Sequence, residues 1–146
     1  MIRVAVQTAP VNTAREMANH DAGGHGATAS FIGRVRGDGG LLELFLEHHP
    51  VLTEAGLREL ARGAADRWAL TELSLIHRVG VMAPGDTIVL VLASSAHRAE
   101  ALAACTFLID RLKIDVMLWK RETFGDGRVA WVEPREIDAR RAEHWD

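Results

Sequence analysis

The stretch Thr87-Ile88-Val89-Leu90-Val91-Leu92-Ala93 is a long apolar run that begins just after a proline- and glycine-containing turn. Because no polar residue alternates with the apolar ones, the run predicts a β-strand that is buried on both faces. A long helix is predicted soon after it, over about residues 96–113. The inner stripe of this helix is expected to include Leu102, Cys105, Ile109 and Leu112. The sequence therefore predicts a central strand next to a helix that packs on its sheet.

Outward from this run, the chain divides into short strands and one more long helix. Residues 27–36 alternate in polarity and residues 41–47 follow a glycine-rich turn, so 27–47 is predicted to be a β-hairpin. A helix over roughly 53–68 is predicted from an apolar face formed by Leu57, Leu60, Ala61, Ala64 and Trp68. The other predicted segments are a strand at 2–8, a short helix at 12–20, a strand at 71–79, a turn at 81–86, a strand pair at 116–124 and 128–133, and a charged tail at 134–146.

This order of elements predicts an α+β fold in a single domain that spans residues 1–146. We expect a mixed, mostly antiparallel sheet with two long helices packed on it. A doubly wound parallel sheet is less favoured, because the sequence has neither a glycine-rich dinucleotide turn nor a P-loop lysine.

The chain has 146 residues, with 17 Lys and Arg against 20 Asp and Glu, for a formal net charge of −3. This balance excludes a global basic surface for nucleic acid or an anionic membrane, so any anion site must be local. The one cysteine excludes an internal disulfide framework and fits a reducing compartment. No apolar run reaches the ~18–20 residues of a membrane span, and residues 1–7 are more typical of a strand than of a signal peptide. A cytoplasmic protein is therefore expected.

Several common site chemistries are poorly supported by the sequence. The seven histidines show no HxH or HExxH spacing, and the adjacent His48 and His49 project apart, so no metal site is expected. There is no GxSxG motif for a hydrolase nucleophile. Cys105 lies on the apolar stripe of its helix, which favours a buried structural thiol over a nucleophile.

Two basic pairs instead indicate an anion site. His97 and Arg98 are predicted in the first turn of a helix, where cations are unfavourable unless an anion binds among them. Arg34 and Arg36 are two apart in a strand, so both guanidinium groups are expected on one face, where they repel unless something negative lies between them. The alternative for each pair is that its charges are simply solvated.

Two lysines extend this interpretation. Lys113 lies at a helix end, where it also complements the helix dipole, and Lys120 shares a strand face with Glu122. A lysine beside an apolar wall and other cations has a lowered pKa and becomes a usable base, unless its strand end is simply solvated. His97 and Lys113 are about 24 Å apart along one helix, so one metabolite does not easily touch both. They serve either two sites or one pocket shared across a homodimer, and we favour the dimer.

Six segments in order resemble the large, catalytic subunit of molybdopterin synthase over about residues 2–133. They are Phe31-Ile32-Gly33-Arg34-Val35-Arg36, Leu46-Glu47-His48-His49-Pro50, Ile76-His77-Arg78-Val79-Gly80, Pro84-Gly85-Asp86, Ser95-Ala96-His97-Arg98 and Leu118-Trp119-Lys120-Arg121-Glu122. The resemblance implies an α/β hammerhead-type fold with an additional antiparallel subdomain. It also implies a reaction in which cyclic pyranopterin monophosphate becomes molybdopterin, the dithiolene ligand of the molybdenum cofactor. Three positions depart from the usual pattern, namely Gly37, His49 and Met117.

The resemblance further implies the partners and the site residues. Sulfur arrives as a thiocarboxylate on the C-terminal Gly-Gly of a ubiquitin-like small subunit, and a dimer of the large subunit carries one small subunit at each end. No metal or organic cofactor is implied. The implied catalytic residues are Lys113 and Lys120, and the implied substrate-binding residues are Arg34, Val35, Arg36, His97, Arg98, Lys113, Lys120, Arg121 and Glu122. The alternatives are a non-catalytic module that binds a pterin phosphate and an unrelated phosphometabolite transferase.

Overall fold

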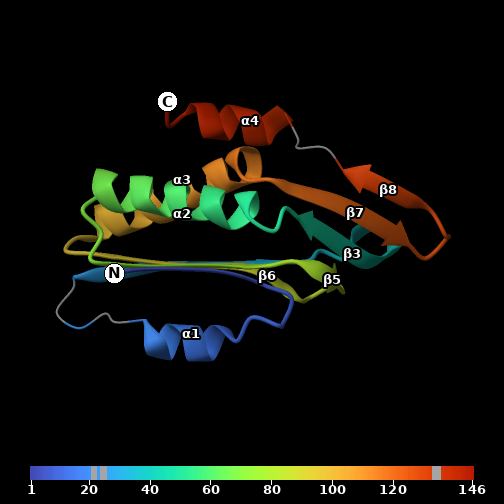
Figure 1. Cartoon of the computed structure of the whole chain (residues 1–146), viewed down its shortest axis with the longest axis horizontal. Coiled ribbons are helices and arrows are strands. Elements are labelled where there is room, and N and C mark those ends of the chain that lie inside the picture. The colour runs from blue at the N-terminus through green and yellow to red at the C-terminus, as the bar shows by residue number, and fades with distance from the viewer. Residues whose placement is uncertain (21–22, 24–25, 133–135) are drawn as a thin grey trace.

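The computed structural model of the chain describes residues 1–20, 23, 26–132 and 136–146. The described strands form two four-stranded sheets (Figure 1). The first, sheet A, has the spatial order β1 (Ile2–Gln7), β4 (Glu72–Arg78), β6 (Thr87–Ser95) and β2 (Ala27–Arg34). The second, sheet B, has the order β5 (Gly80–Met82), β3 (Leu41–His48), β7 (Leu118–Phe124) and β8 (Val129–Val132). The helices are α1 (Thr13–Asn19), α2 (Leu52–Arg67), α3 (Arg98–Asp115) and α4 (Glu136–Glu143), with a short 3-10 turn at Asp38–Gly40.

Strand β6 is buried on both faces, as its apolar run predicts. Val91 and Ala93 point into a core shared with α2 and α3, whereas Leu90 and Leu92 belong to a smaller core on the opposite face. Figure 1 shows α2 and α3 on one side of sheet A and α1 on the other. Because β1 and β4 are parallel and the other strand pairs are antiparallel, the predicted mixed α+β fold is confirmed.

The predicted hairpin over 27–47 is wrong, because its two strands belong to different sheets. Strand β2 pairs with β6 in sheet A, whereas β3 pairs with β5 and β7 in sheet B. The connecting segment contains Gly39 and Gly40 at φ of 64° and 80°, a conformation that glycine adopts without strain and that lets the chain turn into sheet B. The predicted turn at 81–86 is also partly wrong, since β5 occupies its start.

The inner face of α3 differs from the predicted stripe. Ala101, Ala104 and Leu108 are fully or almost fully buried, whereas Leu102 is 58% exposed. Small alanine side chains let the helix lie close to sheet A, so the stripe is set by close packing instead of by the largest apolar residues. Cys105 and Leu112 are buried as predicted.

The charged C-terminal segment was predicted as a tail, but it contains helix α4. Trp145, just beyond α4, packs edge-on against Trp68 and Phe107 at ring distances of 5.5 and 5.6 Å. Its indole Nε1 donates a hydrogen bond to Asp110 Oδ2 at 2.9 Å. These contacts hold the segment against α2 and α3, and Figure 1 shows α4 lying over them.

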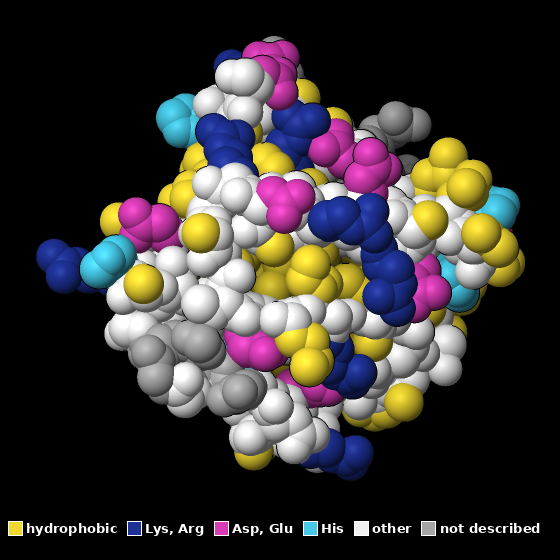
Figure 2. All heavy atoms as spheres, turned by 60° about the vertical axis from the view of Figure 1, so that its left-hand side comes forward, with side chains coloured by type: hydrophobic (Ala, Val, Ile, Leu, Met, Phe, Trp, Pro, Cys, Tyr) yellow, Lys and Arg dark blue, Asp and Glu magenta, His cyan; other side chains and the backbone are white. Residues whose placement is uncertain are grey.

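The surface carries charges of both signs. Figure 2 shows basic and acidic side chains interspersed over one face, in keeping with the small net charge. Within the described ranges, we find no helix that combines the length and the apolar character needed to cross a membrane.

Candidate active site

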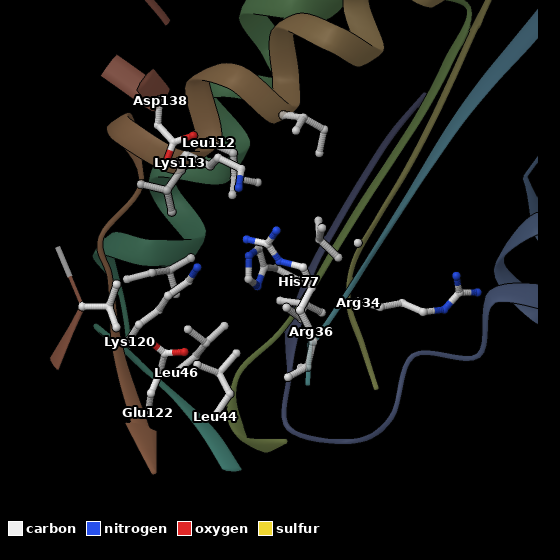
Figure 3. Close-up of a pocket in the computed structure, with 18 of the residues that line it drawn as sticks. Arg34, Arg36, Leu44, Leu46, His77, Leu112, Lys113, Lys120, Glu122 and Asp138 are labelled. Carbon is white, nitrogen blue, oxygen red and sulfur yellow. The ribbon is translucent and has the colours of Figure 1, made fainter. Parts of the chain in front are cut away.

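A cavity of about 640 Å³ lies where the C-terminal half of α3 meets both sheets (Figure 3). This volume is in the range of small-molecule sites in proteins. Its apolar walls include Leu44 and Leu46 from β3 and Leu112 from α3. The charged and polar residues that line it are Arg34, Arg36, Asp38, His77, Lys113, Lys120, Glu122 and Asp138.

Arg36 enters the cavity from the loop after β2, and the turn between β5 and β6 holds that loop. The Val35 N–H donates to the Asp86 carbonyl at 2.9 Å, and the Gly85 N–H donates to the Val35 carbonyl at 2.8 Å. Asp86 is itself paired with Arg78 at 3.3 Å. The Pro84-Gly85-Asp86 turn therefore fixes the backbone that carries Arg36, while buried Val35 contributes packing and backbone contacts.

Arg34 and Arg36 do not share a face, contrary to the period-two prediction. The pairing of β2 with β6 shifts register between Gly33 and Arg34, and such a bulge breaks the alternation of side chains. Arg34 still forms part of the wall, but Figure 3 shows its side chain directed away from the group around Arg36. Arg36 is therefore the arginine that points to the cavity.

The predicted faces of β7 are confirmed. Lys120 lies opposite Leu46 in the strand register and Glu122 lies opposite Leu44, and all four residues line the cavity. Arg121 points to the other face of sheet B, where its guanidinium stacks over the Phe45 ring at 4.7 Å. Of the Lys-Arg-Glu triplet, the first and third residues therefore face the cavity of this chain.

Lys113, in the last turn of α3, faces Lys120 across the cavity. Although part of the Lys120 side chain is exposed, desolvation lowers the pKa of its ammonium group, and the positive charge of Lys113 lowers that pKa further. Glu122 and Asp138 act in the opposite direction, and Arg36 adds a smaller lowering effect. The expectation of a lysine with a lowered pKa is confirmed for Lys120.

Three charged or polar cavity residues were missed by reasoning from the sequence, namely Asp38, His77 and Asp138. His77 of β4 is buried, and burial lowers its pKa to about 4. The sequence pattern that could have identified His77 is the alternation of Leu73 and Leu75, because His77 is the next residue on the same strand face and is polar. Asp138 is also buried, but it lies on α4, which the sequence interpretation treated as a tail, so no periodic signal was used there.

The sequence of the chain also matches a known protein family. A family model described as MoaE protein matches residues 6–115.

The chain belongs to the MoaE family.

A Haemophilus ducreyi relative named molybdopterin synthase catalytic subunit is 44% identical over 124 residues, which is 82% of this chain and 81% of the relative. A Vibrio cholerae relative of the same name is 40% identical and covers 99% of this chain and 98% of the relative. These matches confirm the resemblance found in the six sequence segments.

Solved structures agree with this family and with the fold. The MoaE protein of Burkholderia ambifaria has a TM-score of 0.85 and 36% identity, with 99% of this chain and 98% of that chain covered. A Helicobacter pylori chain, solved as a complex of subunits 1 and 2 of molybdopterin-converting factor, has a TM-score of 0.70, 17% identity and coverage of 92% and 91%. At that identity the likeness concerns the fold alone.

Not all the residues that the resemblance implied for the site lie at the cavity of one chain. His97 is the N-cap of α3 and Arg98 is its first residue, so they lie at the opposite end of the helix from Lys113. The helix runs to Asp115, which keeps these ends about 24 Å apart, as the sequence predicts. Both residues are exposed and neither lines the cavity.

The remaining sequence predictions concern His49, cysteine and metal. His49 has a local structural role, because its Nδ1 accepts hydrogen bonds from the Val51 and Leu52 N–H groups where α2 begins. Burial raises the pKa of the Cys105 thiol to about 11, which fits the predicted inert structural residue. Among the residues that the structure describes, no group of three or more His, Cys, Asp or Glu side chains is arranged to hold a metal ion.

Proposed function

We propose that this chain is the catalytic subunit of a molybdopterin synthase and acts in molybdenum cofactor biosynthesis. Its substrate is cyclic pyranopterin monophosphate, and sulfur comes from the C-terminal thiocarboxylate of a ubiquitin-like small subunit. The single observation that carries the proposal is the convergence of Arg36, Lys113 and Lys120, from three separate elements, on one cavity of about 640 Å³. The single buried cysteine fits this reaction, because the partner supplies the sulfur and no thiol of this chain is needed.

The three cations have different tasks in the proposed reaction. Arg36 binds the anionic part of the substrate, because a guanidinium forms strong charge-assisted hydrogen bonds with phosphate. Lys120 transfers protons during sulfur addition, because a lysine with a lowered pKa releases a proton more readily near neutral pH. Lys113 supplies the neighbouring positive charge that keeps this pKa low and also contacts the substrate. Glu122 lies on the same cavity face of β7 as Lys120, and its negative charge opposes the lowering of the Lys120 pKa.

The complete site is shared between two copies of this chain. His97 and Arg98 lie at the far end of α3 from Lys113, so we propose that a neighbouring copy contributes them to this cavity. We assign Arg34 and Arg121 to substrate binding as well, although neither side chain joins the group formed by Arg36 and the lysines: Arg121 lies on the other face of sheet B, and Arg34 points away from Arg36. The assembly is a dimer of this chain with one small subunit at each end, and the expected compartment is the cytoplasm.

A reconstituted reaction tests the proposed function. Purified chain, thiocarboxylated small subunit and cyclic pyranopterin monophosphate should yield molybdopterin, and Lys113→Ala should abolish the product without unfolding the chain. Tight substrate binding without product would instead indicate a non-catalytic binding module. Turnover without any ubiquitin-like partner would indicate a different transferase.

Subunit mixing tests the shared site. Arg98→Ala and Lys113→Ala chains should each be inactive, and mixed dimers should regain activity because they contain one intact site. Mass spectrometry of differently tagged chains confirms that mixed dimers form. No recovery in confirmed mixed dimers would contradict the shared site.

A further inference from the structure

His77 is a buried side chain of the cavity to which the proposed reaction assigns no role. It lies on β4 and is 3% exposed, on the same strand face as Leu73 and Leu75. Those leucines pack into the main core, whereas His77, nearer the end of the strand, lines the cavity. Figure 3 shows its ring beside the side chain of Arg36.

One ring nitrogen of His77 has a fixed partner. Nδ1 lies 2.8 Å from the carbonyl oxygen of Arg78. A carbonyl oxygen only accepts hydrogen bonds, so Nδ1 must carry the proton and donate it. In the neutral ring the second nitrogen, Nε2, then holds a lone pair and can only accept.

Burial, more than the neighbouring charges, keeps the ring neutral. Burial and the ammonium group of Lys120 lower the pKa of His77 to about 4. The cations Arg34, Arg36 and Lys113 also line this cavity, and so do the carboxylates of Asp38 from the 3-10 turn, Glu122 from β7 and Asp138 from α4. At neutral pH, Nε2 is therefore an uncharged hydrogen-bond acceptor in a cavity rich in donors.

An uncharged acceptor is distinctive in this cavity. Among the described lining residues, every other side chain is either apolar or carries a formal charge. Arginine and lysine side chains can only donate hydrogen bonds, so they serve the phosphate of a guest, whereas its N–H and O–H groups need acceptors because an unpaired buried donor is costly. The carboxylates of Asp38, Glu122 and Asp138 are charged acceptors, and His77 adds the uncharged acceptor among the described lining side chains, on the β4 wall of the cavity.

We propose that His77 is a substrate-binding residue whose Nε2 accepts a hydrogen bond from an N–H or O–H group of the substrate's ring system. This inference rests on the proposed function, since it deepens the description of the same cavity. It assigns His77 a part in selectivity as well. A guest with an acceptor at that position is rejected, because two lone pairs would face each other.

Two variants separate this role from a structural one. His77→Asn keeps an amide donor near the position of Nδ1, so it can still bond the Arg78 carbonyl, but it lacks a group at the position of Nε2. His77→Gln places its amide near the position of Nε2 and loses the Nδ1 contact. We expect His77→Asn to keep a Tm close to that of the wild type and to bind cyclic pyranopterin monophosphate roughly two- to tenfold more weakly. His77→Gln should show the reverse, with a lowered Tm and near-normal affinity.

Calorimetric dissociation constants and thermal unfolding of the full chain, each without the small subunit, give these values. Wild-type affinity in a folded His77→Asn chain would overturn the inference. So would a His77→Gln chain that binds more weakly than a His77→Asn chain of near-wild-type affinity, because the histidine would then act only through its backbone contact with Arg78. Failure of the wild-type chain to bind the substrate would instead refute the proposed function.

A measurement on the wild-type chain needs no variant. In chain labelled with ¹⁵N-histidine, the Nε2 resonance of His77 reports whether that nitrogen accepts a hydrogen bond. Titration with cyclic pyranopterin monophosphate should shift this resonance and leave the protonated Nδ1 resonance nearly in place. An unchanged Nε2 resonance at saturating substrate would overturn the inference, even if both variants failed to fold.

Discussion

Replacing Trp145 by alanine should detach the C-terminal segment and destabilise the chain. The indole makes edge-on contacts with Trp68 and Phe107, each of which contributes about 0.5–1.5 kcal/mol. Its Nε1 also donates a hydrogen bond to the carboxylate of Asp110, which contributes about 1.5–3 kcal/mol. Because Trp145 is only half-buried, we expect a loss near the lower end of the sum, about 3 kcal/mol in the free energy of unfolding.

Urea unfolding followed by circular dichroism measures this loss, and Trp131→Ala is the matched control. Trp131 is 56% exposed on β8, and the guanidinium of Arg121 lies over its ring at 5.8 Å. The control should therefore lose less than about 1 kcal/mol. Hydrogen exchange in Trp145→Ala should be fastest over α4. If both alanine variants lost the same small amount, the anchoring of α4 by Trp145 would be refuted.

Three further predictions follow from burial and charge. Leu108→Ala should lower the free energy of unfolding by about 2–5 kcal/mol in urea, because the Leu108 side chain is fully buried. Leu102→Ala, at an exposed site on the same helix, should cost under about 1 kcal/mol. Equal losses in the two variants would contradict the observed buried face of α3. The pKa of His77 is about 4 in the folded chain against 6.5 for the ordinary group, so the unfolded state takes up this proton first as pH falls. The contribution of the neutral ring to the free energy of unfolding is therefore complete above about pH 6.5 and declines by up to ~1.4 kcal/mol per pH unit towards pH 4. His77→Gln should remove this part of the pH dependence of stability. An identical pH dependence in the variant would argue against a neutral buried ring. Lys113→Gln should raise the pKa of Lys120 in an NMR titration because a neighbouring positive charge is removed, and an unchanged or lower value would contradict the coupling.

The parts of the fold that could be predicted from the sequence are those set by local periodicity. The apolar run at Thr87–Ala93 identified a strand buried on both faces, and period two on β7 put Lys120 and Glu122 on one face. Both features depend only on side chains within one regular element. For the same reason, the inner face of α2 was correctly expected at Leu57, Leu60, Ala61 and Ala64.

The errors occurred where distant parts of the chain decide the structure. Strand partners are chosen across the whole chain, so β2 pairs with β6 instead of with the next strand in sequence. The register shift at Arg34 depends on that pairing and turned its side chain away from Arg36. Helix α4 has a polar sequence, and contacts with distant residues hold it, including those of Trp145 with Trp68 and Phe107 and the hydrogen bond of Arg111 to the Ala142 carbonyl, which periodicity does not reveal.

The cavity was predicted in its charges but not in its full composition. Arg36, Lys113 and Lys120 were expected to meet around an anion, and the structure brings all three to the same cavity. Asp138 was missed because α4 was missed. His97 and Arg98 lie far from the cavity of their own chain, so their proposed contribution to a site requires a second copy of the chain.

The most direct test of the central claim is the affinity of the chain for cyclic pyranopterin monophosphate, measured by isothermal titration calorimetry on Arg36→Ala and Arg62→Ala. Arg36 points to the cavity, whereas Arg62 is exposed on α2, so the Arg62→Ala control removes the same charge away from the cavity. Loss of one charge-assisted contact of about 1.5–3 kcal/mol predicts a roughly ten- to hundredfold weaker Kd for Arg36→Ala and little change for Arg62→Ala. Equal dissociation constants for the two variants would contradict an anion site at this cavity.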